Sequence, residues 1–313
     1  MSTSLNKLAQ QLALAMLGIS LILPSSSALA TNSEIEAKAP HSDDQSLRSI
    51  LRQASKARVY ITPSSSELKQ VAQLFSVLLQ APYNFARLQK QAQALQMELR
   101  QIDGMTLLME QAEAQRGRGL YAFRNGKAAH ILQVPHAFTD EMTREIGLAL
   151  FAEGRFAAVA FNTVPRRFKD ANNLEVLADM THINDSYFLE FAKAAAQALP
   201  NSKSLQIHGF DQSKRKTNSL AATDIILSAG HKQPPPSLQQ GHKKLQQTMQ
   251  TGVTLYANEV KELGATTNLQ AQALRAIGYQ NFIHVELSRP MREALRSDAK
   301  QRQRLLTSLL DGV

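Results

Sequence analysis

The residues with the clearest chemical potential begin at a histidine that follows an apolar run. His136 comes directly after Pro135, beyond the apolar residues 128–134, and Asp140 and Glu141 follow where a helical pattern opens. Ligand sites of open α/β sheets form at such strand ends. Zinc accepts imidazole nitrogens and carboxylate oxygens as ligands. The spacing therefore allows a divalent metal to bind between His136 and one of the two carboxylates.

A second histidine and a later glutamate stand in comparable positions. His208 ends another apolar strand pattern, and Gly209 lets the chain turn immediately after it. Glu286 lies inside the apolar residues 282–288, where strand alternation places it on the same face as His284. An unpaired buried carboxylate is costly, so Glu286 needs either a partner or a function.

Each of these residues also has a purely structural interpretation. His136 could cap an element or pack in the core, and Glu286 could pair with Arg289 or Arg292 at the start of the last helix. We expect the remaining histidines to be structural or solvated: His130, His231, His242 and His284.

Asp179 and His182 form a rival metal-binding pair. They are three positions apart and would share one face if that stretch were helical. Alternatively, they could orient a metal-bound histidine from outside the ligand set, as carboxylates often do.

The elements that would position these residues alternate between strands and helices. We therefore expect residues 103–313 to form an α/β domain with a single mixed, largely parallel sheet flanked by helices. Residues 124–127 contain Asn-Gly, a strong signal for a β-hairpin turn. The expected strands cover residues 105–109, 120–123, 128–134, 156–161, 205–207, 224–227, 253–256 and 282–288, and the expected helices residues 140–153, 187–199, 238–249, 269–277 and 290–310.

The preceding residues, 45–102, have a mainly helical pattern. We expect helices over residues 46–57, 65–79 and 84–102 and a short strand over residues 59–62. This N-terminal helical region could pack on the main domain or on a partner, and packing on the domain is the simpler expectation.

The first thirty residues have the pattern of a secretory signal. One charge, Lys7, precedes an apolar run over residues 12–23, and small residues lead to a cleavage site after Ala30. An uncleaved membrane anchor is the alternative, but the apolar run is too short to favour a permanent span. Residues 31–44 are polar and without periodicity, which indicates a flexible leader.

The amino-acid composition limits the cellular locations and the kinds of partner that we expect. The sequence has no cysteine and a net charge of +9. An exported protein without disulfides must fold through packing alone, which favours a periplasmic location. The basic residues are largely scattered and no nucleic-acid-binding motif is present, so we expect no nucleic-acid partner. We also expect no stable membrane span after the signal is removed.

The order and placement of these motifs resemble the zinc carboxypeptidase superfamily. The resemblance is closest to the phage-type poly-γ-glutamate hydrolases and the N-formylglutamate amidohydrolase-like enzymes. The stretches that carry it are Pro135-His136 with Asp140 and Thr143, Ile207-His208-Gly209, and Val285-Glu286-Leu287-Ser288-Arg289 with Arg292. The resemblance implies a zinc ion held by His136, Asp140 and His208, and a catalytic role for Glu286 as the base that activates water.

The first motif departs from the family pattern. The family commonly has His-x-x-Glu or a slightly longer spacing, whereas Asp140 stands four positions after His136 and Glu141 follows it. Consecutive helical residues point about 100° apart, so only one of the two carboxylates is expected to face the metal. We choose Asp140, because its spacing to Thr143 matches the family's acid-x-x-Thr pattern, and Glu141 is the substitute.

The resemblance also implies an acidic substrate. Asn162 with Arg166 or Arg167 resembles the Asn-plus-Arg carboxylate clamp of zinc carboxypeptidases, and Arg292 is another candidate, since arginine binds carboxylates through paired bonds. The implied activity is hydrolysis of an amide bond next to a carboxylate, in a γ-glutamyl compound, a peptidoglycan-derived peptide or an N-acyl amino acid.

Two other functions compete with this prediction. A serine hydrolase would need a nucleophile elbow, and residues 31–313 contain no Gly-x-Ser-x-Gly. A non-catalytic periplasmic binding protein of the same fold could use a basic cleft to hold an anionic ligand. Metal content separates the hydrolase from the binding protein.

Overall fold

The structure, a computed structural model, describes residues 42–54, 58–126, 128–216 and 222–311, which belong to one unit, Ala39–Val313. Its α-helices are α1 (Ser42–Ala54), α2 (Ser65–Leu78), α3 (Phe85–Ala94), α4 (Thr143–Ala152), α5 (Tyr187–Ala198), α6 (Pro236–Thr248), α7 (Leu269–Ala276), α8 (Arg289–Ser297) and α9 (Ala299–Leu310). Its strands are β1 (Met97–Ile102), β2 (Met105–Glu110), β3 (Leu120–Arg124), β4 (His130–Val134), β5 (Phe156–Phe161), β6 (Arg167–Lys169), β7 (Glu175–Leu177), β8 (Ser204–Gly209), β9 (Ile225–Ser228), β10 (Val253–Leu255) and β11 (Phe282–Leu287).

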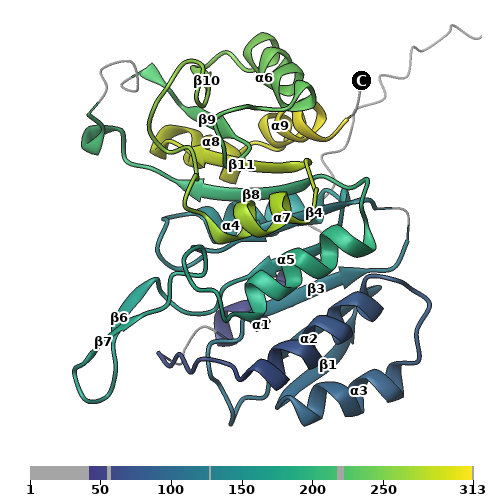
Figure 1. Ribbon diagram of the computed structural model, residues 1–313. Coiled ribbons are helices and arrows are strands. Elements are labelled where there is room, and N and C mark those ends of the chain that lie inside the picture. Colours follow the sequence, from purple (N-terminus) through teal and green to yellow (C-terminus); the bar gives the residue numbers. More distant parts are fainter. Residues whose placement is uncertain (1–41, 55–57, 127, 217–221, 312–313) are drawn as a thin grey trace, which may run out of the picture. The chain divides into compact units, whose positions relative to one another are not determined.

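A mixed sheet forms the centre of the fold (Figure 1). Within the described ranges, nine strands pair in the order β1-β2-β3-β5-β4-β8-β11-β9-β10. The central strands β5, β4, β8 and β11 are parallel to one another, while β1, β2 and β3 add antiparallel pairs on one side. On the other side β9 is antiparallel to β11 and parallel to β10. The expected mixed α/β sheet with a parallel centre is confirmed.

Helices cover both faces of this sheet because alternate strand residues point to opposite sides. Ile283, Val285 and Leu287 of β11 join a buried cluster with side chains from α1, α4, α6, α8 and α9. On the other face, a second cluster joins α2, α3 and α5, and Phe75 and Phe191 pack there with ring centroids 5.4 Å apart. The helices α1, α2 and α3 therefore share their buried clusters with the sheet.

The predicted helix over residues 84–102 is wrong beyond Ala94. Gln96 adopts a positive φ of 55°, a conformation that does not continue a right-handed helix. The chain then forms β1, which pairs antiparallel with β2. Met97 and Leu99 are both buried at the two-residue spacing of a strand. Leu99 also fits the helical pattern, and pairing with β2 decides the outcome.

Two other local predictions also fail. Residues 59–62 form no strand; Ile61 donates its backbone N–H to the carbonyl oxygen of Arg116. The turn at Asn125-Gly126 does not produce a hairpin, because β5 lies between β3 and β4. A turn signal specifies a change of direction, but the partner of the following strand depends on residues far away in the sequence.

The structure also contains elements that the sequence pattern did not indicate. The strands β6 and β7 form a separate two-stranded antiparallel ribbon, visible as a protruding hairpin in Figure 1. The expected last helix is interrupted at Asp298, whose carboxylate accepts the backbone N–H groups of Lys300 and Gln301 and so begins a new helix, α9.

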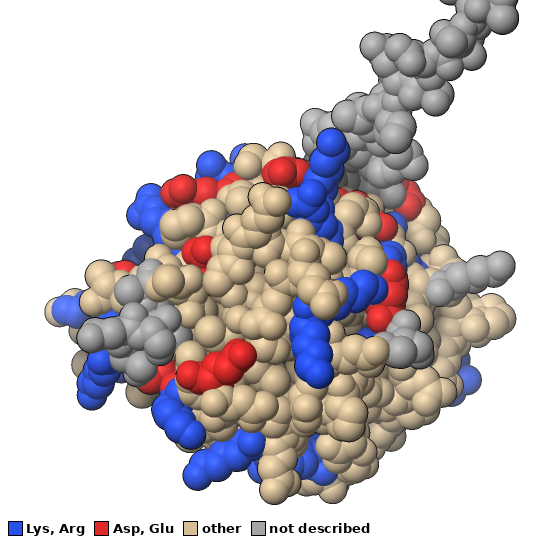
Figure 2. Space-filling model, turned by 90° about the horizontal axis from the view of Figure 1, so that it is seen from above, with Lys and Arg blue, Asp and Glu red and all other residues tan. Residues whose placement is uncertain are grey.

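The predicted signal (residues 1–30) and most of the predicted leader (residues 31–44) lie outside the described residues. Among the helices that the structure describes, none combines the length and apolar character needed to cross a membrane. On the face shown in Figure 2, lysine and arginine side chains are dispersed among acidic and uncharged residues and form no continuous basic patch.

The contact between α4 and the sheet predicts a cost for a single added methyl group. A Cβ at Gly147 would lie 2.7 Å from Val134 Cγ2 and 3.0 Å from Phe161 Cε1. Helix propensity favours alanine over glycine by about 1 kcal/mol, whereas overpacking costs about 1–3 kcal/mol. We expect Gly147→Ala to lower the free energy of unfolding, measured by urea denaturation. Unchanged or increased stability would contradict the tight packing.

Candidate metal centre

The candidate site lies at the carboxyl ends of the parallel strands. His136 follows β4, His208 is the fifth residue of β8, and Glu286 of β11 stands opposite His208 in the parallel register. Their side chains line one cavity of about 380 Å³ together with Asp140. The sequence places each residue near a strand end, and the strand order β4-β8-β11 brings these ends together.

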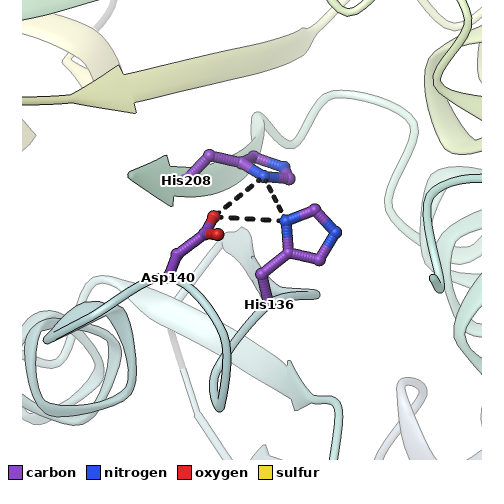
Figure 3. Close-up of side chains that lie close together, drawn as sticks. All are labelled: His136, Asp140 and His208. Atoms are coloured by element: carbon purple, nitrogen blue, oxygen red, sulfur yellow. Dashed lines mark hydrogen bonds and ion pairs between the residues drawn. The ribbon is translucent and has the colours of Figure 1, made fainter. Parts of the chain in front are cut away.

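His136, Asp140 and His208 converge on one point (Figure 3). His136 Nδ1 lies 3.0 Å from His208 Nδ1 and 3.2 Å from Asp140 Oδ2, and His208 Nδ1 lies 3.6 Å from the same oxygen. Four tetrahedral ligands at zinc–ligand distances of about 2.0–2.2 Å are separated by about 3.3 Å. The three atoms therefore have the chemical types and the mutual separations that suit a zinc ion.

Asp179 fixes the orientation of the His136 ring. His136 Nε2 donates to Asp179 Oδ1 at 2.9 Å, because an ionised carboxylate can only accept. In the neutral imidazole this leaves the lone pair on Nδ1, which faces His208 and Asp140. The same carboxylate accepts bonds from Thr181 and Arg166, so Asp179 is itself held in place.

The structure places Asp140, and not Glu141, beside the two histidines. Asp140 is mostly buried, and its Oδ2 also accepts the backbone N–H of Gly209 at 3.1 Å. Glu141 is exposed and lies 3.4 Å from Arg289. Helix α4 begins only at Thr143, later than expected, because Met142 has a positive φ of 68°. The turn before the helix points Asp140 toward the histidines.

The electrostatics of this group follow from burial and close opposite charges. Burial opposes ionisation of Asp140, but the adjacent rings of His136 and His208 hold the pKa of its carboxyl well below the usual range. Burial also opposes protonation of His136, yet Asp140 and Asp179 raise the pKa of that ring. Burial lowers the pKa of His208 to about 4, with Asp140 acting in the opposite direction. Without a metal, the cluster therefore keeps His208 neutral.

Glu286 is a buried acid beside this cluster. Its side chain is about 10% exposed, and Oε2 has no hydrogen-bond partner among the described residues. Burial, with a contribution from the charge of Asp140, raises the pKa of Glu286 to about 8. A carboxyl group that exchanges its proton near neutral pH can serve as a general acid or base.

We predicted a structural or solvated His284, but this side chain lines the same cavity as His208 and Glu286. Its ring lies 4.6 Å from the His208 ring centroid, and its Nε2 lies 3.6 Å from Glu286 Oε1. His208, His284 and Glu286 form a second group whose candidate ligand atoms lie within 4.8 Å of one another. The alternation of β11 already placed His284 and Glu286 on one face and could have signalled this role.

The predicted carboxylate-binding residues are only partly brought together. Arg166 lines the cavity and pairs with Asp179 at 2.7 Å. Arg167 is exposed on β6 and pairs with Glu175 of β7 at 3.2 Å, so it does not line the cavity. The hairpin turns it away, which could not be seen from its position after a strand.

Asn162 and Arg292 are engaged with the backbone. Asn162 donates to the carbonyl oxygens of Pro135 and Val164 and so supports the turn that carries His136. Arg292 is buried and donates to the carbonyl oxygens of Phe210 and Leu287. Neither side chain lines the cavity. Both therefore stabilise the walls of the site.

The cavity is also lined by polar residues that we did not predict from the sequence. Lys214 and Arg215, in a short basic run, contribute positive charge, and Arg215 lies 3.9 Å from Glu262. Asp179 and His182, the rival metal pair, lie 3.2 Å apart, but Asp179 contacts His136 and His182 is half exposed at the cavity. Their placement matches the alternative in which Asp179 orients a histidine.

Solved structures similar to this chain include the three described next, while no family model and no curated protein matches it. An N-formylglutamate amidohydrolase from Ralstonia eutropha JMP134 has 16% identity, a TM-score of 0.40, and covers 62% of this chain and 96% of its own. A gene product from Agrobacterium tumefaciens has 10% identity, a TM-score of 0.41, and coverage of 58% and 87%. A metallo-carboxypeptidase from Burkholderia cenocepacia has 9% identity, a TM-score of 0.38, and coverage of 80% and 70%.

The first and third structures carry names from the group that the sequence motifs resemble. Their identities and TM-scores are low, so they assign no role to an individual residue of this chain.

The buried acid predicts a pH-dependent loss of stability. The folded protein keeps Glu286 protonated up to a pKa of about 8, whereas the unfolded chain ionises near 4.5. The folded state binds the extra proton between these values, so stability falls as pH rises from about 4.5 to 8. We expect Glu286→Gln to remove this component in the metal-free protein, measured by urea denaturation at pH 5 and pH 8. Glu175→Gln, at an exposed position, is the control, and equal pH profiles for both variants would contradict the burial argument.

Proposed function

We propose that this protein is an exported zinc-dependent amidohydrolase or carboxypeptidase-like enzyme. The observation that carries the proposal is the convergence of His136 Nδ1, His208 Nδ1 and Asp140 Oδ2 in one cavity. Three ligands from the protein leave one position of a tetrahedral zinc for water or substrate, which is the arrangement of catalytic rather than structural sites.

The chemistry divides between the metal and the residues around it. A zinc ion held by His136, Asp140 and His208 would polarise a carbonyl group and lower the pKa of water. Glu286 would accept a proton at Oε2 from the attacking water and deliver it to the leaving amine nitrogen. A cation beside Glu286 favours its ionised form, because an opposite charge lowers a carboxyl pKa. The cavity therefore has both a base and a ligand set.

Three basic side chains at the cavity support an acidic substrate, and the acids Asp140, Asp211 and Glu286 line the cavity as well. Arg166, Lys214 and Arg215 line the same cavity as Glu286. An arginine can bind a carboxylate through parallel hydrogen bonds. We therefore propose that the cleaved amide bond is next to a carboxylate, as in a γ-glutamyl compound, a peptidoglycan-derived peptide or an N-acyl amino acid. The amino-terminal pattern supports export to the periplasm with cleavage after Ala30.

Metal analysis tests the ligand set. We expect the purified protein to bind one zinc ion, His208→Ala to lose it, and Asp179→Asn to weaken zinc binding by about 10–100-fold, as changes of orienting residues do. Zinc content is measured after dialysis, and affinity by competition with a chelator. His231→Ala and Asp170→Asn are matched controls outside the cavity. Full zinc retention by His208→Ala would remove this histidine from the site.

Activity measurements test the role of Glu286. We expect hydrolysis of N-acyl-glutamate or γ-glutamyl peptides by the zinc-loaded protein. Glu286→Gln should lower kcat by about 10²–10⁴-fold, because it removes general acid–base catalysis while zinc remains bound. A zinc-bound variant with unchanged kcat would contradict this role. Tight binding of acidic peptides without turnover by the unaltered protein would instead indicate a binding protein.

A further inference from the structure

A buried amide network lies next to the ring of His208. Gln206 precedes His208 by two positions on β8, so both side chains point to the same face. The Oε1 atom of Gln206 lies 2.9 Å from His208 Nε2 and 2.6 Å from Asn268 Nδ2. Gln206 is fully buried and Asn268 is nearly so. A wrongly oriented amide of Gln206 would therefore leave buried polar groups unpaired, which is costly.

A backbone N–H group fixes the orientation of Asn268. Asn268 is the N-cap of α7, and its Oδ1 accepts the backbone N–H of Ala271 at 3.0 Å. A backbone N–H can only donate, so the oxygen of this amide must face the helix. The NH₂ group of Asn268 then faces Gln206, and it requires an acceptor there.

A backbone carbonyl fixes the other end of the network. Gln270 donates from Nε2 to the carbonyl oxygen of Met180 at 2.7 Å, and a carbonyl can only accept. The oxygen of Gln270 therefore faces Gln206 Nε2, at 3.4 Å, and Gln133 Oε1 accepts from the same nitrogen at 3.0 Å. The N–H of Ala271 and the carbonyl oxygen of Met180 thus both require the same orientation of the Gln206 amide, with its oxygen toward His208.

This orientation determines the tautomer of His208. Because Gln206 Oε1 is an acceptor, His208 Nε2 must carry the hydrogen. The neutral ring then has its lone pair on Nδ1, which is the atom that faces His136 and Asp140. His136 receives the equivalent arrangement from Asp179.

We propose that Gln206 and Asn268 are positioning residues that hold His208 in the Nε2–H tautomer, with Nδ1 presented for metal binding. The proposal rests on the metal site of the proposed function. It adds that the N-terminus of α7, through its capping residue, prepares one metal ligand before any metal binds. Neither side chain belongs to a candidate ligand group. Gln206 contacts the His208 ring directly, and Asn268, which also lines the cavity, acts on that ring through Gln206.

The substitution Asn268→Asp distinguishes the effect on the His208 tautomer from two other effects: loss of the α7 cap and a change of charge near the metal site. Aspartate still accepts the N–H of Ala271 and caps α7, but its ionised carboxylate cannot donate to Gln206. Two oxygens then face each other, so the α7 end of the network opposes the orientation in which the Gln206 oxygen faces His208, and the Nε2–H tautomer loses part of its support. The added negative charge alone would strengthen the binding of a cation, whereas loss of the tautomer weakens it. The two explanations therefore predict opposite signs.

Asn84→Asp is the matched control. Asn84 caps α3 in the same way, accepting the backbone N–H of Arg87 at 3.0 Å, and it does not line the cavity. We expect Asn268→Asp to weaken zinc affinity by about 10–100-fold at pH 8 and Asn84→Asp to leave it unchanged. Equal or tighter zinc binding by Asn268→Asp would overturn the proposal.

The tautomer can also be read directly in the metal-free protein. Long-range ¹⁵N–¹H NMR of histidine-labelled protein distinguishes the two neutral tautomers, and His208→Asn identifies the signals of this ring. We expect the Nε2–H form in the unaltered protein and in Gln206→Glu, which keeps the acceptor. The Nδ1–H form of His208 in the unaltered protein would overturn the proposal. Absence of zinc binding by the unaltered protein would refute the proposed function, while this NMR result would still decide the tautomer.

Discussion

The close approach of three electron-rich atoms is the constraint on which the site depends. Two imidazole nitrogens and a carboxylate oxygen lie within 3.0–3.6 Å of one another in a buried environment. Lone pairs at such distances repel unless a proton or a cation lies between them, and burial strengthens this repulsion because the local dielectric is low. In the metal-free protein, the raised pKa of His136 favours such a proton, and the rest of the fold keeps His136, His208 and Asp140 together. A cation at this point would convert the repulsion into binding energy.

The surrounding structure orients both imidazole rings. In each ring, Nε2, the nitrogen that points away from the other two candidate ligands, faces a fixed hydrogen-bond acceptor. Asp179, which follows the β6–β7 hairpin, takes this place for His136, and Gln206 takes it for His208. Both acceptors are themselves held by several hydrogen bonds, so the rings have little freedom to turn. Arg166 pairs with Asp179 and also lines the cavity. One ion pair therefore connects the lining of the cavity with the orientation of the His136 ring.

Glu286 shows the balance between stability and chemical function. An acid buried on an otherwise apolar strand lowers the stability of the folded protein above the ordinary carboxyl pKa. The opposite face of β11, with Ile283, Val285 and Leu287, contributes to the largest hydrophobic cluster. The strand can therefore carry an unfavourable residue on its site face because its other face is well packed. The burial of Glu286, which is unfavourable for stability, therefore supports a functional role for this residue.

The sequence by itself determined the local features: the strands that end at His136 and His208, the alternation that exposes Glu286 to the cavity, and the α/β succession. These follow from the spacing of apolar residues, which depends only on neighbours in the chain. Tertiary structure decided the remainder. In the folded chain, β5 lies between β3 and β4. Residues 97–102 form an edge strand, and Arg167 lies away from the cavity, paired with Glu175. The insertion of β5 depends on pairing between distant segments, and the other two outcomes depend on pairing with a neighbouring strand, β2 or β7. The apolar pattern of a single segment does not contain the free energy of such pairing.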